Sequence, residues 1–388
     1  MAKYLVNPIA SFDRIQEHFI TYIKSQFGTH YASIEKERDK LLRSDGVLSR
    51  EPWIELQPNY EPVKSARGIP MNIAELEAQY FPGMTTNQIE VFKNIMNAGL
   101  FSGGFPLYWH QAEMLRKSLS GEDCIITSGT GSGKTESFLL PLLADIVKEA
   151  TTWPKPQYLP WNWWDRDNIR PKSIFNDSNL ANGDIIRLRD EYLQRSGENR
   201  PAAIRALILY PMNALVEDQM SRLRDALDND DVQNTLAAVL NGNKIFLGRY
   251  NSNTPVSGAP RAGDTNGCRK VFNRLKEELL NVQRLSKETI DMYKEAIESK
   301  DKELLKKYKE RRKITQTLHG CEGLSTAEMI TRFDMQVTPP DILITNYSML
   351  ATLLMREIDI PMIEKTREWL LGETNMENPT RIFPLGHR

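Results

Sequence analysis

Residues 124–136, Cys-Ile-Ile-Thr-Ser-Gly-Thr-Gly-Ser-Gly-Lys-Thr-Glu, join a short apolar run to a glycine-rich loop that ends in Lys134 and Thr135. The three glycines allow the backbone to curl so that successive N–H groups point inward. An apolar helix follows, and the positive end of its dipole points at the same place. The lysine would bring a mobile positive charge to the β- and γ-phosphates, and the threonine hydroxyl would be a ligand for Mg²⁺. The stretch therefore predicts a polyphosphate-binding loop.

This phosphate loop is predicted to run from Ser128 to Thr135. The strict motif GxxxxGK[ST] has glycine at the position of Ser128, and the rest of the pattern is present. A glycine-rich turn from strand to helix with a chance Lys-Thr pair is the purely structural alternative. The residues predicted to hold the phosphates are Ser128, Gly129, Thr130, Gly131, Ser132, Gly133, Lys134 and Thr135, and Thr135 would also contact the metal ion.

The composition is that of an ordinary folded protein. The chain has 388 residues, of which 40% are hydrophobic and 26% charged, enough for about two or three domains. A net charge of −1 creates no global field, so any contact with nucleic acid must come from a local patch. The three cysteines lie far apart and show no metal-ligand spacing with the histidines. No signal peptide or long apolar run is apparent, so we expect a cytoplasmic protein without a membrane span.

The first part of the chain is predicted to be mainly helical. Apolar residues at helical spacing make residues 9–27 an amphipathic helix, and several prolines make residues 51–67 an extended linker. The linker separates an N-terminal accessory region from the core, and residues 1–100 are expected to comprise this helical accessory region and the linker. The expected helices cover residues 9–27, 31–42, 72–98, 107–115 and 137–150.

Three apolar runs predict strands further along. Residues 206–210, Ala-Leu-Ile-Leu-Tyr, form a continuous run of the kind found in buried parallel strands, and a helix should follow. Residues 244–250 and the run after Pro340 are the other candidates. The resulting alternation of strands and helices indicates an α/β fold with a parallel sheet flanked by helices.

Two segments are predicted to be insertions in this fold. Residues 151–200 contain Trp153, Trp161, Trp163 and Trp164 among prolines, which suits a surface insertion held by its aromatic residues or, alternatively, a stacking surface for unpaired bases. Residues 256–335 include a long, charged helical stretch from Val271 to about Leu318 that ends in basic residues. A solvated hairpin and an arm that faces nucleic acid are both compatible with it.

The order of the motifs is similar to that in the first RecA-like lobe of superfamily 2 helicases. The phrases RPAAIRALILYPMNALVEDQMSRLR, GRYNSNTPVSG and PPDILITNYSML most resemble the large bacterial DEAD/DEAH-box helicases found in phage-defence gene clusters such as DISARM. The resemblance covers about residues 106–380. It implies a RecA-like P-loop NTPase lobe from residue 101 onward, with ATP and Mg²⁺ as cofactors and nucleic acid as partner, DNA rather than RNA.

The resemblance also assigns roles by position. Gln111 corresponds to the glutamine that recognises adenine, although an exposed helical glutamine without this role is the alternative. Tyr347 and Ser348 stand where relatives have proline and glycine, so the second backbone contact departs from the family pattern. The positions that correspond to contacts with the phosphodiester backbone are Pro211, Met212, Asn213, Ala214, Thr345, Asn346 and Ser348.

The acidic motif of the family, four apolar residues followed by Asp-Glu, does not follow residues 339–350, and no catalytic residue can be assigned. From the resemblance we expect a lobe that is incomplete at its C-terminal end, leaves residues 123–127 without a strand neighbour, and depends on a completing helicase polypeptide. Such a portion should bind nucleotide and hydrolyse almost none. The alternative function is a binding module that holds nucleotide or nucleic acid without turnover.

Overall fold

The computed structural model describes residues 8–49, 59–129, 131–156, 194–195, 198–258, 267–299, 301–308, 310 and 327–372. The chain divides into two compact units between Asn59 and Tyr60. In the first unit, helices α1 (Pro8–Gln26) and α2 (Ala32–Leu42) confirm the two helices predicted there. Ion pairs from Lys24 to Asp39 and from Arg43 to Glu17 join these helices.

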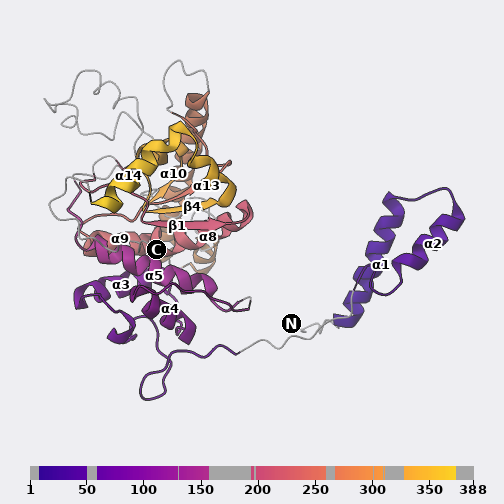
Figure 1. Ribbon diagram of the computed structural model, residues 1–388, viewed down its shortest axis with the longest axis horizontal. Helices are drawn as coiled ribbons and strands as arrows, with labels where there is room; N and C mark the ends of the chain where they lie inside the picture. Colours follow the sequence, from indigo (N-terminus) through magenta and orange to yellow (C-terminus); the bar gives the residue numbers. More distant parts are fainter. Residues whose placement is uncertain are drawn as a thin grey trace. The chain divides into compact units, whose positions relative to one another are not determined.

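A four-stranded parallel sheet organises the second unit (Figure 1). The predicted strand at 206–210 is confirmed. The candidate at 244–250 forms a strand only over Leu247–Tyr250, and the run after Pro340 forms one over Ile342–Asn346. The order across the sheet is β1-β4-β2-β3, so β4 lies between β1 and β2, and only β2 and β3 are neighbours both in sequence and in the sheet. The strands are β1 (Ala206–Tyr210), β2 (Leu247–Tyr250), β3 (Glu328–Met329) and β4 (Ile342–Asn346).

Helices cover both faces of this sheet, as the alternation of side chains along β4 shows. Ile342 and Ile344 lie in the main hydrophobic core, whereas Leu343 belongs to a separate cluster on the opposite face. The main-core face carries α3 (Thr86–Ala98), α4 (Trp109–Leu119), α5 (Lys134–Ala150), α8 (Asn213–Leu227) and α9 (Asp230–Val239) (Figure 1). The opposite face carries α13 (Tyr347–Leu353), a short turn η3 (Glu357–Asp359) and α14 (Ile360–Leu371). The predicted α/β RecA-like class is thereby confirmed.

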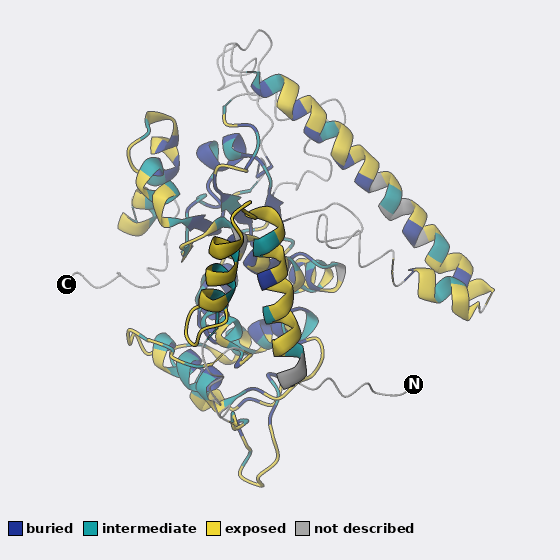
Figure 2. Cartoon of the chain, turned by 90° about the vertical axis from the view of Figure 1, so that its right-hand side faces the viewer, coloured by how far each residue is buried: buried dark blue, intermediate teal, exposed yellow. Residues whose placement is uncertain are grey.

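The long charged stretch forms α10 (Cys268–Glu298), a helix of 31 residues. Its apolar positions recur at helical spacing: Phe272, Leu275, Leu279 and Val282 follow one another every three or four residues and are buried. They pack against Phe333 of α12 (Arg332–Val337), and Figure 2 shows buried residues recurring along the otherwise exposed long helix. The basic residues 311–313 lie outside the described ranges.

One expectation was wrong, and one of two alternatives is excluded for Trp153. The helix predicted for residues 72–98 begins at Thr86, after a single turn η1 (Ala78–Tyr80), because the Thr85 side chain and Gln88 form a capping box there. Trp153 is no stacking surface for bases, since it is buried and the Arg200 guanidinium lies 3.5 Å from its ring centre. The other tryptophans of that segment lie outside the described residues.

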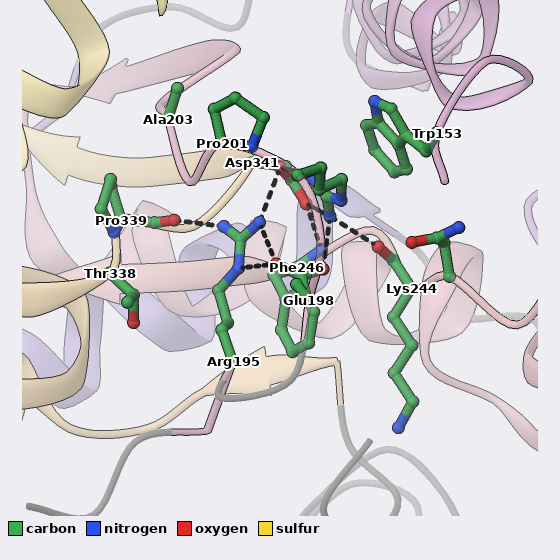
Figure 3. A network of polar contacts seen from close by, with 12 residues as sticks. Trp153, Arg195, Glu198, Pro201, Ala203, Lys244, Phe246, Thr338, Pro339 and Asp341 are labelled. Carbon is green, nitrogen blue, oxygen red and sulfur yellow. Dashed lines mark hydrogen bonds and ion pairs between the residues drawn. The ribbon is translucent and has the colours of Figure 1, made fainter. Parts of the chain in front are cut away.

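A buried network of ion pairs lies at the amino end of β4 (Figure 3). The Asp341 carboxylate accepts hydrogen bonds of 2.7 and 2.8 Å from Arg200 and one of 2.8 Å from Arg205. Arg195 lies 3.5 Å from the same carboxylate and donates to the backbone oxygen of Pro339. The side chains of all three arginines are at most 2% exposed. The network therefore ties the chain between α5 and β1 to the start of β4.

A second buried carboxylate, Asp228, should make stability depend on pH. Its Oδ1 accepts a hydrogen bond from the backbone N–H of Ala327, and burial raises its pKa to about 8. Because this pKa lies above the unfolded value of about 3.9, the folded state holds the extra proton, and stability should fall as pH rises between those values, by at most about 1.4 kcal/mol per pH unit. Burial raises the pKa of Asp145 to about 6, so the window from pH 6 to 8 reports mainly on Asp228. We expect Asp228→Asn to flatten this slope in urea unfolding, and exposed Asp231→Asn to leave it unchanged; an unaltered slope in Asp228→Asn would contradict the assignment.

None of the helices that the structure describes is both long and apolar enough to cross a membrane.

Candidate nucleotide and nucleic-acid site

The phosphate loop enters α5 through left-handed backbone conformations at Gly131, with φ 78°, and Gly133, with φ 72°. Gly133 has no room for a side chain, because a Cβ there would lie 2.3 Å from Nε2 of Gln111. Both positions therefore need glycine. The loop ends at the N-terminus of a 17-residue helix, where free N–H groups and the helix dipole favour an anion.

Two adjacent side chains of helix α4 form hydrogen bonds with this loop. Nε2 of Gln111 donates to the Gly133 carbonyl at 3.1 Å, while its Oε1 accepts from the backbone N–H of Tyr108 at 2.9 Å. A ring nitrogen of His110 lies 2.9 Å from the Ser132 carbonyl. Gln111 is only 4% exposed, so the alternative of an exposed helical glutamine is wrong. In this arrangement Gln111 positions the phosphate loop, and recognition of adenine by its amide stays a prediction.

The side chains of the phosphate loop leave the Lys134 ammonium group free to contact a ligand. Ser128 and Ser132 share a hydrogen bond of 2.6 Å between their hydroxyls, which closes the loop internally. Lys134 is exposed, and no described acidic side chain forms an ion pair with it. Thr130 lies outside the described residues. The positive backbone angles, the helix N-terminus and the exposed ammonium group together fit a polyphosphate.

Three aromatic rings that sequence reasoning missed lie beside the loop. Tyr60 lies 5.7 Å from Tyr108 and 5.4 Å from His110 between ring centres, and the last two rings are stacked at 5.6 Å. The Tyr60 hydroxyl accepts a hydrogen bond of 2.9 Å from the backbone N–H of Gly129. Tyr60 falls in the predicted linker, where no periodicity marks it, so only the fold could connect it to a loop 69 residues away.

Removing the Tyr60 hydroxyl should strengthen phosphate binding. The hydroxyl occupies a loop N–H that a phosphate oxygen would otherwise accept from. Because one neutral hydrogen bond contributes about 0.5–1.5 kcal/mol, Tyr60→Phe should raise nucleotide affinity about 2- to 10-fold. Tyr80→Phe, at a tyrosine for which no contact to the loop is seen among the described residues, is the control. Equal or weaker binding by Tyr60→Phe in a calorimetric titration would show that the hydroxyl supports the loop and does not compete for it.

Helix α8 links the phosphate loop to the sheet. Nε2 of Gln219 lies 3.5 Å from the Thr135 hydroxyl, and Arg222 donates to the carboxylate of Glu136 at 2.9 Å. Thr135 and Glu136 belong to the first turn of α5. No cluster of three or more metal-binding side chains occurs within the described ranges, and the contact of Thr135 with a metal ion stays a prediction.

The predicted nucleic-acid residues gather at the carboxyl ends of β1 and β4. Nδ2 of Asn346 donates to Oδ1 of Asn213 at 2.7 Å, although the residues are 133 positions apart. Oδ1 of Asn346 also caps α13 by accepting from the Met349 N–H at 2.7 Å. The strand register explains why these two side chains are in contact, since β1 and β4 are paired in parallel and end together at Tyr210 and Asn346.

The remaining members of this set differ in exposure. Pro211, Met212 and Ser348 are exposed, with 60% of Met212 accessible, whereas only the backbone of Ala214 is described. Thr345 is fully buried, and its hydroxyl donates to the Tyr250 carbonyl at 2.5 Å. The Thr345 side chain thus supports the turn from inside, whereas Asn213 and Asn346 are half-buried and Ser348 is exposed.

Comparisons with known proteins relate the chain to helicases and to a Druantia protein. Residues 108–249 match the family model described as DEAD/DEAH box helicase. The chain is 28% identical over 377 residues, or 92% of its length, to Druantia protein DruE of Escherichia coli (strain UMEA 4076-1). It spans 17% of the length of that curated relative. No solved structure matches the chain significantly. Residues 108–249, which include the phosphate loop, α5, β1 and α8, are a DEAD/DEAH box helicase domain.

Proposed function

We propose that this chain is the ATP- and strand-binding front portion of an ATP-dependent DNA helicase or translocase that acts in the cytoplasm, in antiviral defence or DNA processing. One observation carries the proposal: α8 begins at the paired Asn213 and Asn346 and contacts the first turn of α5 through Gln219. A single rigid helix therefore touches both the strand-binding residues and the nucleotide loop. Through such a connection, nucleotide binding would change the affinity for nucleic acid.

Different residues would bind the nucleotide and the nucleic acid. The N–H groups of residues 129–133 and the Lys134 ammonium group would hold the β- and γ-phosphates, and Thr135 would orient the metal ion that ATP brings. ATP would supply the free energy for stepping. The asparagines and the α8 N-terminus would hold phosphodiester groups without reading bases, because backbone contacts carry no direct sequence information. DNA is proposed over RNA from the family resemblance.

Binding to single-stranded DNA should be weak, independent of sequence and steeply dependent on salt. Asn213→Ala should reduce the affinity about 5- to 10-fold for every sequence, because it removes one hydrogen-bonding group of the site and the partner of Asn346. The measurement is fluorescence anisotropy with labelled oligonucleotides of two compositions at low and moderate salt. Asn234→Ala, in the separate helix α9, serves as the matched control. A preference for one sequence, or binding that survives about 0.5 M salt, would contradict a phosphate-holding site.

The alternative, a binding module without turnover, predicts that the two ligands bind independently. The helicase proposal predicts that ATP changes the affinity for single-stranded DNA and that DNA changes the affinity for ATP by the same factor. Gln219→Ala should reduce this factor while leaving both separate affinities within about twofold, because the 3.5 Å contact with Thr135 is a weak one. Independent binding in the unaltered chain would favour the module.

A further inference from the structure

The two paired asparagines each have an exposed apolar neighbour. Met212 directly precedes Asn213 and is 60% exposed, and Tyr347 directly follows Asn346 and is 74% exposed. The hydrogen bond between the asparagine side chains brings both pairs of residues together at the carboxyl ends of β1 and β4. A site that only holds phosphates needs polar groups, so the two large apolar side chains require a separate explanation.

The outward side of α13 continues this apolar surface. Tyr347 and Ala351 of the helix and Leu354 at its C-cap recur after four and three residues, which places them on one side, and all three are exposed. A surface helix ordinarily buries its apolar residues and exposes polar ones. Because α13 also exposes an apolar stripe, this side of the helix has the character of an interaction surface.

The backbone that carries the Tyr347 ring is well supported from behind. Oδ1 of Asn346 accepts a hydrogen bond of 2.7 Å from the Met349 N–H, and the buried Thr345 hydroxyl donates to the Tyr250 carbonyl. Met349 also packs against the hydrophobic cluster on the face that holds α14. The ring itself lies in the open. Its position is therefore fixed at the backbone before a ligand arrives, which lowers the entropic cost of binding.

The ring is a departure from the family pattern. Tyr347 stands where relatives have proline. Phosphates at such a turn are held by backbone N–H groups and small polar side chains, and an aromatic ring contributes nothing to that contact. The ring is thus available for a contact that the phosphate-holding residues do not make.

An unpaired nucleobase is the occupant that this surface suits. A base has two flat faces and is joined through its sugar to a phosphate, so a strand with phosphates at the asparagines would bring bases to the apolar neighbours. Stacking on aromatic side chains is the usual contact of proteins with unpaired bases, and it tolerates any base because every base has a π-face. In a duplex, neighbouring base pairs cover these faces and only the base edges can be reached.

We propose that the Tyr347 ring stacks on an unpaired base of the strand held at Asn213 and Asn346, and that this contact makes the site prefer single strands to duplexes. Met212 and Leu354 extend the apolar surface beside the ring. The proposal rests on the proposed function, because it needs a nucleic-acid strand at the asparagines. It adds a contact that depends on the presence of bases and not on their sequence.

The test compares oligothymidylate with an abasic strand of equal length, which has the same phosphates and no bases, in fluorescence anisotropy. The unaltered chain should bind oligothymidylate at least about fivefold more tightly, as one stacked base implies. Tyr347→Ala should lose this difference and keep its affinity for the abasic strand and for a blunt duplex within about twofold. Tyr347→Phe should retain most of the difference. Tyr31→Ala, at a tyrosine that is 68% exposed in the first unit, is the control and should change nothing.

The outcomes separate this proposal from the proposed function. Equal affinities for the two strands in the unaltered chain would overturn the stacking contact and leave the phosphate-holding site standing. A difference that survives Tyr347→Ala would also overturn it, because the bases would then be contacted elsewhere. If Tyr347→Ala weakens both strands equally, the ring supports the asparagines and does not stack. Binding of neither strand would overturn both proposals.

Photochemical cross-linking identifies the residue in contact with the base. An oligothymidylate with 5-iodouracil in place of one thymine forms adducts with aromatic side chains stacked on that base, and peptide mass spectrometry locates them. We expect an adduct at Tyr347, and adducts confined to other residues would overturn the proposal. Light scattering tests the other occupant of the surface. If the unaltered chain is a dimer that Tyr347→Ala separates, the apolar stripe is an interface between copies and the proposal is wrong.

Discussion

Asp341→Asn should lower the free energy of unfolding by about 3–5 kcal/mol, which is the usual cost of removing one partner of a buried ion pair. The carboxylate accepts hydrogen bonds from Arg200 and Arg205 and from the backbone N–H of Phe246, and its side chain is fully buried. Asparagine keeps the size but removes the charge and one acceptor, so three buried guanidinium groups would have only the carboxylates of Glu198 and Glu149 as counter-ions. Urea unfolding at neutral pH measures the effect.

The control for this substitution is Asp291→Asn. Asp291 is 61% exposed and lies 4.0 Å from Lys294, so the change should cost less than about 0.5 kcal/mol. The pH dependence gives a further check. The three guanidinium groups hold the pKa of Asp341 well below its usual range, so its contribution is complete above the unfolded pKa of about 3.9 and is lost as pH falls below that value. A cost below about 1 kcal/mol, with acid sensitivity unchanged, would mean that the network contributes little.

Lys134→Ala should weaken nucleotide binding about 10- to 100-fold. The ammonium group would form a charge-assisted contact with the β- and γ-phosphates, which contributes roughly 1.5–3 kcal/mol. The side chain is exposed in this structure, so its loss should leave the fold intact. Isothermal titration with ATP and Mg²⁺ measures the affinity, and thermal unfolding checks the fold.

Lys148→Ala removes the same charge from the last turn of the same helix, about 20 Å away at 1.5 Å of rise per residue. It should leave the nucleotide affinity within about twofold, because screening is nearly complete over that distance. Equal losses in both variants would mean that general charge, and not the loop, attracts the nucleotide. An unchanged affinity in Lys134→Ala would remove the phosphate loop from the binding site.

The sequence predicts those parts of the fold that are determined by residues within one short segment. Residues 206–210 form a strand because a continuous apolar run suits a buried parallel position. The phosphate loop could be predicted because the chemistry of polyphosphate binding needs glycines, a lysine and a helix start in one order. The family resemblance pointed to both Asn213 and Asn346. Their contact is then expected, because both residues lie at the carboxyl ends of paired parallel strands.

The features that were missed depend on distant partners. Strand β3 has only two residues and is held by pairing with β2, so no run of apolar residues marks it. Residues 122–129 form no strand even though Ile125 is apolar, and that side chain is 92% exposed. Arg200 is 141 positions from Asp341, and in sequence it is one charge in a polar segment. Contacts of this kind become visible only when the topology is known.

The most direct test of the central claim is a titration of the 388-residue chain with ATP in the presence of Mg²⁺, followed by calorimetry, with inorganic triphosphate as competitor. If residues 128–135 hold the polyphosphate of a nucleotide, one molecule of ATP should bind saturably, and triphosphate should displace it because it fills the same loop. If ATP fails to saturate the chain at millimolar concentration, or binds but is not displaced by triphosphate, the phosphate loop is not the nucleotide site.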